Sequence, residues 1–112
     1  MKIKQREIYE VYLDPVKGSE QGGRRPAVVI SGNLANENLN TIIVCPLTSK
    51  LKHYYGNLIL KEGYPYGLTQ TSEVMTIHIR SIAKERLQKR LGIISNSELD
   101  QLKDTLQKIL SY

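Results

Sequence analysis

The sequence predicts a mainly β (α+β) protein, in which a small, curved antiparallel sheet or partial barrel is covered by one C-terminal helix. Two observations support this fold class. Short apolar or alternating runs, separated by Gly, Pro, Asn and Asp, follow one another along most of the chain, as expected for many short strands. Only the stretch after residue 94 has helical spacing. With 112 residues, the chain is expected to be a single domain spanning 1–112.

Three runs are expected to form the main strands. Residues 6–13 alternate between apolar and polar side chains and end at Asp14-Pro15. Residues 27–31 and 41–47 are nearly continuous apolar runs, which is typical of buried strands. Pro26 cannot donate a backbone hydrogen bond, so it marks the entrance of the second run.

Shorter strands and connections are expected between and after these runs. Residues 57–60 and 92–94 are short strand candidates. The Asn-rich residues 32–40 predict a loop, and residues 62–69 hold Gly and Pro at turn-forming positions. Residues 51–55 look like an exposed connection.

Residues 72–80 alternate well enough to predict one more strand. Met75, Ile77 and Ile79 are expected on one face. Because successive strand residues point to opposite faces, Thr76, His78 and Arg80 are expected on the other.

The last element is expected to be a helix. Ser95 and Glu98 have the spacing of a capping box, in which each side chain accepts a hydrogen bond from the backbone of the other. One face of the helix then carries apolar side chains at helical spacing, namely Leu99, Leu102, Leu106, Ile109 and Leu110.

Composition limits the location and the partners. The net charge of +5 is compatible with a polyanionic partner. The single cysteine cannot form an internal disulfide. No apolar run is long enough to span a membrane, and the N-terminus lacks the apolar core of a signal peptide. We therefore expect a cytoplasmic protein with no membrane contact.

The segment 18–26 is the clearest candidate for a site. It holds three glycines and ends in Arg24-Arg25-Pro26. Glycines let backbone N–H groups approach a ligand, and guanidinium groups bind phosphate in a forked geometry. Elsewhere, Cys45 lies in an apolar run and is expected to fill the core. No group of residues has metal-ligand spacing, so no metal or other cofactor is expected.

Three segments resemble the MazF/PemK/Kid family of toxin endoribonucleases. Asp14-Pro15 followed by Gly18-Ser19-Glu20-Gln21 and Arg25-Pro26 is similar to a family motif with the same order. Residues 44–49 (VCPLTS) resemble its Val-x-Pro-x-Thr-Ser segment, and residues 78–87 resemble its Gln-Ile-Arg-Thr-Ile-Asp-Lys-x-Arg-Leu segment. The chain departs from that pattern at His78, where Gln is usual, and at Ala83, where Asp is common.

The resemblance implies an SH3-like barrel with a C-terminal helix that acts as a homodimer, cleaves single-stranded RNA without metal and is neutralised by a cognate antitoxin. It implies that Arg25 and Thr48 are the catalytic pair, and that attack by the 2′-OH leaves a 2′,3′-cyclic phosphate and a 5′-OH. Substrate contacts are expected from side chains of the three matching segments: Ser19, Glu20, Gln21, Arg24, Ser49, His78 and Arg80.

Two alternatives use the same fold. One is a gyrase poison resembling CcdB, which needs neither Arg25 nor Thr48. The other is a basic RNA-binding module without catalysis, with affinity that falls steeply with salt. For the enzyme, the residue that removes the 2′-OH proton is open between Glu20 and His78, because arginine stays protonated and is a poor base. For His78, hydrogen bonding to a base edge is favoured over acid–base chemistry.

Overall fold

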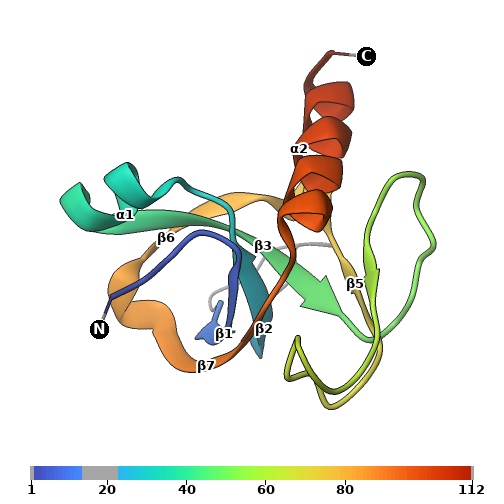
Figure 1. The fold of residues 1–112 in the computed structure, drawn as a ribbon, viewed down its shortest axis with the longest axis horizontal. Coiled ribbons are helices and arrows are strands. Elements are labelled where there is room, and N and C mark those ends of the chain that lie inside the picture. The colour runs from blue at the N-terminus through green and yellow to red at the C-terminus, as the bar shows by residue number, and fades with distance from the viewer. Residues whose placement is uncertain (1, 14–22, 112) are drawn as a thin grey trace.

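The computed structural model of the protein describes residues 2–13 and 23–111. These residues form one 7-stranded sheet in the order β4-β5-β3-β2-β1-β7, with β6 also paired to β3 (Figure 1). Neighbouring strands run antiparallel. The strands are β1 (Glu7–Tyr12), β2 (Arg24–Val29), β3 (Thr41–Thr48), β4 (Ile59–Leu60), β5 (Ser72–Val74), β6 (Arg80–Ala83) and β7 (Leu87–Ile93).

Strand β3 is the centre of this sheet. One of its edges pairs with β2, and the other is shared by two strands: residues 41–44 pair with β6, and Leu47 and Thr48 pair with β5. A sheet whose central strand changes partner in this way curls into a half-barrel, as Figure 1 shows. The predicted fold class, a small curved antiparallel barrel with a C-terminal helix, is confirmed.

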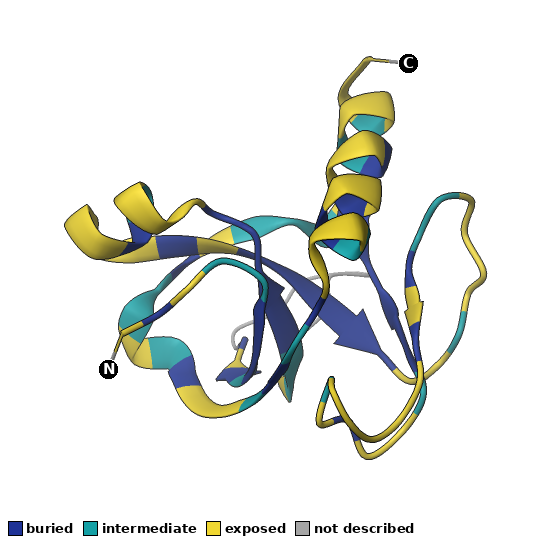
Figure 2. Ribbon diagram, viewed as in Figure 1, coloured by how far each residue is buried: buried dark blue, intermediate teal, exposed yellow. Residues whose placement is uncertain are grey.

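Helix α2 (Asn96–Ser111) covers one end of the half-barrel. The predicted capping box is present: the Glu98 N–H donates to Ser95 Oγ at 3.0 Å, and the Ser95 N–H donates to Glu98 Oε1 at 2.8 Å. Leu99 and Leu102 are buried, whereas Leu110 is 77% exposed. The sheet therefore covers only the first part of the apolar helix face (Figure 2).

The core consists of two apolar clusters, one on each face of β3. Cys45 and Leu47 pack with the helix residues, and Ile42 and Val44 pack on the opposite face with side chains of β1 and β2. Because both faces of β3 are buried, its sequence is a continuous apolar run rather than an alternating one. Cys45 is fully buried, which raises the pKa of its thiol to about 12; its predicted role as a core residue is confirmed.

Two predictions of local structure are wrong. Residues 32–40 contain a short helix, α1 (Asn33–Asn38), because Asn36 turns inward and bonds to Ser31 instead of forming a turn. The Asn36 Nδ2 group donates to the Ser31 carbonyl at 2.9 Å, and the Ser31 hydroxyl donates to Asn36 Oδ1.

The expected strand over 72–80 is divided into β5, the 3₁₀ turn η1 (Thr76–His78) and β6. The last hydrogen bond of this segment to the end of β3 is donated by the Met75 N–H to the Pro46 carbonyl. Pairing with β3 resumes at Arg80, which is opposite Val44. Thr76 is consequently buried and Ile77 is 54% exposed, the reverse of the expected alternation.

The remaining boundaries differ by a few residues. Strand β2 begins at Arg24 and includes Pro26, and β7 is longer than the predicted 92–94 because it begins at Leu87, directly after the 3₁₀ turn η2 (Lys84–Arg86). In the described ranges, no helix has the length and apolar character needed to cross a membrane.

Candidate active site

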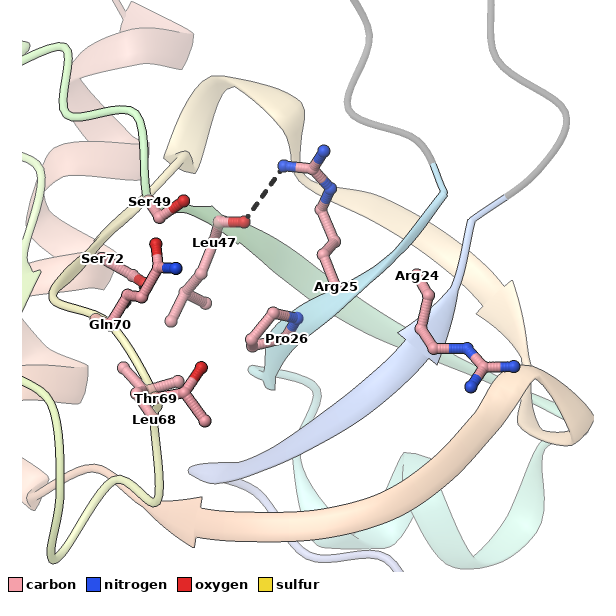
Figure 3. A pocket seen from close by; sticks show the side chains of 9 residues that line it. All are labelled: Arg24, Arg25, Pro26, Leu47, Ser49, Leu68, Thr69, Gln70 and Ser72. Carbon is pink, nitrogen blue, oxygen red and sulfur yellow. Dashed lines mark hydrogen bonds between the residues drawn. The ribbon is translucent and has the colours of Figure 1, made fainter.

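The predicted catalytic pair, Arg25 and Thr48, comes from neighbouring strands. Strands β2 and β3 pair with Ala27 opposite Pro46. Arg25 and Thr48 each lie two residues beyond this pair, so each side chain is on the same face of its strand as Ala27 or Pro46. The Arg25 Nη1 group donates to the Leu47 carbonyl at 3.3 Å (Figure 3). This bond holds the guanidinium over the end of β3.

The Thr48 hydroxyl has a defined orientation. Its side chain is buried, and its Oγ1 accepts a hydrogen bond from the Lys50 N–H at 3.2 Å. A hydroxyl that accepts such a bond still carries a proton that it can donate. Thr48 and Arg25 are therefore both hydrogen-bond donors near the end of β3.

Arg80 lies on the same face of the sheet but further along it. It is opposite Val44 in the pairing of β3 and β6. Val44 and Thr48 are four residues apart, about 13 Å along the strand, and share a face. Arg80 is therefore a half-buried cation on the face of β3 that carries Thr48, but at a distance from it along the strand.

A pocket of about 240 Å³ opens next to Arg25 (Figure 3). Its wall includes three of the predicted site residues, Arg24, Arg25 and Ser49. Thr48 does not line it, although its neighbours on both sides do. The full lining is Arg24, Arg25, Pro26, Leu47, Ser49, Leu68, Thr69, Gln70 and Ser72.

The side of this pocket formed by residues 68–72 was not predicted. Thr69 and Gln70 present exposed polar groups there, and the Ser72 hydroxyl donates to the Gln70 carbonyl at 2.9 Å. These residues have no regular spacing and no charge, so the sequence carries no signal that places them at a site. They reach it because β5 pairs with the end of β3.

The other predicted substrate-binding residues differ in position. Arg24 lies at the pocket rim, but its guanidinium points away from Arg25 (Figure 3) and lies 3.9 Å from the Glu10 carboxylate. His78 is in η1 and does not share a strand face with Arg80. Three further predicted residues, Ser19, Glu20 and Gln21, lie outside the described residues, as does most of the segment 18–26.

One residue that the sequence analysis missed is directly opposite Thr48 in the sheet. Glu73 of β5 pairs with Thr48 and is completely buried.

The described residues contain no group of three or more His, Cys, Asp and Glu side chains that could hold a metal ion.

The fold and the site together define a small half-barrel protein whose cationic pocket suits an anionic ligand. Residues 4–110 match the family model described as PemK-like, MazF-like toxin of type II toxin–antitoxin system. The match spans nearly the whole chain, and the protein belongs to this family.

Relatives agree with this assignment. The chain is 39% identical over 106 residues to a Mycobacterium tuberculosis protein named Endoribonuclease MazF9, with 90% of each chain covered. The crystal structure of MazF (Form-I) from Deinococcus radiodurans is similar with a TM-score of 0.85 and 25% identity, covering 100% of this chain and 99% of the other. The MazE–MazF crystal structure (Form-II) from the same organism has a TM-score of 0.77 and 26% identity, covering 98% and 96%. The predicted family of toxin endoribonucleases is confirmed.

Proposed function

We propose that this toxin cleaves single-stranded RNA without a metal ion, with Arg25 and Thr48 as the catalytic residues. The observation that carries the proposal is their placement: Arg25 and Thr48 lie at the ends of the paired strands β2 and β3, each two residues beyond the Ala27–Pro46 pair, and Arg25 bonds to the Leu47 carbonyl and lines an open pocket. The name of the mycobacterial relative, an endoribonuclease, supports RNA as the substrate.

The proposed reaction is an internal transfer of the phosphodiester. The ribose 2′-oxygen attacks the adjacent phosphorus and loses its proton, and the bond from phosphorus to the 5′-oxygen breaks. The 5′-oxygen takes up a proton, so the products are a 2′,3′-cyclic phosphate and a 5′-OH. Negative charge grows on the non-bridging oxygens during this step, and preorganised donors aimed at those oxygens lower the barrier.

Arg25 and Thr48 are suited to that electrostatic role. The guanidinium is a permanent cation with several N–H donors, and the threonine hydroxyl has its proton available. Neither group is a base at neutral pH. The proton acceptor remains a choice between Glu20 and His78, and pH–rate profiles of wild type and His78→Gln distinguish them. A changed profile assigns acid–base function to His78, and an unchanged one removes it.

Similar structures support the proposed protein partner. MazE–MazF structures, and a mycobacterial endoribonuclease in complex with its cognate antitoxin, support a proteinaceous antitoxin as a partner of this chain. We propose that the toxin is a cytoplasmic homodimer. Exposed apolar side chains that such contacts can cover are Ile43, Ile59, Ile77 and Leu110.

The test is cleavage of a long single-stranded RNA by purified protein in excess EDTA, with analysis of the new ends. We expect defined cuts that leave 2′,3′-cyclic phosphate and 5′-OH termini. A substrate with a 2′-deoxyribose on the 5′ side of a mapped cut should resist cleavage there. Loss of activity in EDTA, cleavage of the deoxy substrate, or retardation of RNA in a gel without cutting contradicts the proposal.

A further inference from the structure

The buried carboxylate of Glu73 connects the Arg25–Thr48 site to the exposed segment that follows β3. Glu73 lies in β5 with Thr48 as its partner in the ladder. It has no solvent exposure, and burial of an unpaired carboxylate is costly. The groups that satisfy it come almost entirely from one short stretch of backbone.

Four hydrogen bonds reach the Glu73 carboxylate. Oε1 accepts from the N–H groups of Lys52 and His53, both at 2.7 Å. Oε2 accepts from the Tyr54 N–H at 3.1 Å and from Asn57 Nδ2 at 2.8 Å. Burial raises the pKa of this carboxyl, but the bonds from Asn57 and the three amides outweigh burial and hold the pKa below its usual value. Glu73 is therefore an anion at neutral pH.

Three consecutive amides directed at one anion impose a particular backbone shape, the concave arrangement that proteins use to bind anions. Here the anion is part of the protein. His53, at the middle of the three, has a left-handed φ of 55°, which is uncommon for a residue with a side chain. The Glu73 carboxylate thus selects one conformation of this segment.

The side chains of the same segment face solvent. Lys52, His53, Tyr54 and Tyr55 are exposed, Tyr55 by 87%. Lysine can neutralise phosphates, and the Tyr54 ring offers a face on which an unpaired base can stack. Lys108 Nζ lies 5.7 Å from the centroid of the Tyr55 ring. The segment begins just after Lys50, whose N–H orients the Thr48 hydroxyl. Because Glu73 is opposite Thr48 in the β3–β5 ladder and binds the backbone of residues 52–54, this segment lies next to Thr48.

We propose that Glu73 is a positioning residue for RNA: through its bonds to the backbone of residues 52–54 it fixes the exposed side chains of 52–55 in the arrangement that binds nucleotides next to the scissile phosphate. This inference rests on the proposed function. Glu73 touches no substrate itself and acts through the segment that it holds.

Glu73→Gln is the appropriate perturbation because it keeps the size of the side chain. Glutamine retains one oxygen acceptor, but its NH₂ group is a donor and would face donors of Tyr54 and Asn57. The segment should then leave its present conformation. Because the side chains of 52–55 would bind substrate and transition state alike, KM should rise while kcat stays nearly constant.

The experiment compares wild type, Glu73→Gln and Asn57→Ala on a short RNA that contains a mapped wild-type cut, with Glu85→Gln as the matched control. Glu85 is an exposed carboxylate of η2, so its substitution makes the same chemical change away from the segment. We expect KM to rise about tenfold in Glu73→Gln, which equals the loss of about one strong hydrogen bond. Asn57→Ala keeps the three backbone bonds and should raise KM by about threefold. The control should match wild type.

Two further readouts separate positioning from simple loss of stability. Amide hydrogen exchange of residues 52–54 should accelerate in Glu73→Gln while the amides of β2 and β3 keep their protection. The pattern of cuts on a long RNA should broaden, because bases next to the scissile phosphate are held less firmly. If Glu73→Gln does not fold, KM, amide exchange and the cut pattern of Asn57→Ala test the positioning role of Glu73 instead.

The outcomes are distinct. A folded Glu73→Gln, or Asn57→Ala in its place, with wild-type KM and an unchanged cut pattern overturns the inference and leaves the proposed function standing. A fall in kcat at constant KM also overturns it. Wild-type protein that cuts no RNA overturns the proposed function itself.

Discussion

Replacing Thr48 by valine removes one hydroxyl from the candidate site and little else. Valine has the shape of threonine and suits a buried strand position, and Thr48 is only 7% exposed. The single bond removed within the described residues is the one that Thr48 Oγ1 accepts from the Lys50 N–H. Lys50 is exposed, so water can replace that acceptor. We therefore expect a stability loss of about 1 kcal/mol or less.

The effect on catalysis should be far larger. Removal of one preorganised donor to a developing oxyanion typically lowers kcat by about 10²–10³-fold. Thr48→Ser restores the hydroxyl and should recover activity to within about tenfold of wild type, as it loses only the methyl group that helps to fix the rotamer.

The assay is single-turnover cleavage of a short RNA at saturating protein, with thermal unfolding of each variant measured in the same buffer. A valine variant that unfolds like wild type and cleaves within threefold of it, on the order of 0.6 kcal/mol in the barrier, refutes the assignment of Thr48. Equal loss of activity in the serine and valine variants, of which only serine keeps the hydroxyl, contradicts the claim that the hydroxyl alone accounts for the role of Thr48.

Three predictions concern the stability of the fold. The pKa of Glu73 is lowered from its ordinary value of 4.5. The ionised carboxylate therefore stabilises the fold above pH 4.5, and this stabilisation is lost as the pH falls below that value. The urea midpoint of wild type should consequently fall more steeply below pH 4.5 than the midpoint of Glu73→Gln. Ser95→Ala removes the bond of the capping box that Ser95 Oγ accepts from the Glu98 N–H and should cost about 1 kcal/mol in urea unfolding; a change below about 0.3 kcal/mol would contradict the role of that cap. Gly67 and Gly63 both have positive φ, but a Cβ at Gly67 would lie 1.8 Å from the Leu91 carbonyl oxygen, whereas Gly63 has open space. Gly67→Ala should therefore unfold at least 10 °C below Gly63→Ala, which itself should lose about 1–2 kcal/mol; equal melting temperatures would contradict the packing of this turn on β7.

The parts of the fold that could be predicted from sequence are those fixed by local patterns. The alternation of residues 6–13 predicted β1, and the apolar run 41–47 predicted β3. Helix α2 was predicted by Ser95 and Glu98 together with the leucine spacing. In each case one period of hydrophobicity, or one cap, determines the local structure.

The parts that could not be predicted depend on tertiary contacts. Residues 72–80 alternate like one strand, but β3 requires two different partners along one edge, so the chain breaks at η1. Asn36 belongs to a turn-forming residue type but is buried against Ser31. In the same way, Arg25 could be proposed from a motif, whereas Gln70, Ser72 and Glu73 reach the site only through the pairing of β5 with β3.

The central claim is that Arg25, and not its neighbour Arg24, acts on the phosphate. The two are adjacent on β2 and therefore lie on opposite faces; Arg25 reaches over the end of β3, and Arg24 points toward Glu10. The most direct measurement is the single-turnover cleavage rate of Arg25→Ala and Arg24→Ala in EDTA, at saturating protein and with matched thermal unfolding. We predict that Arg25→Ala slows cleavage by at least about 10²-fold, and that Arg24→Ala lowers the rate by less than about threefold, its loss appearing in KM. Equal rates in the two variants, or faster cleavage by Arg25→Ala, would contradict the account.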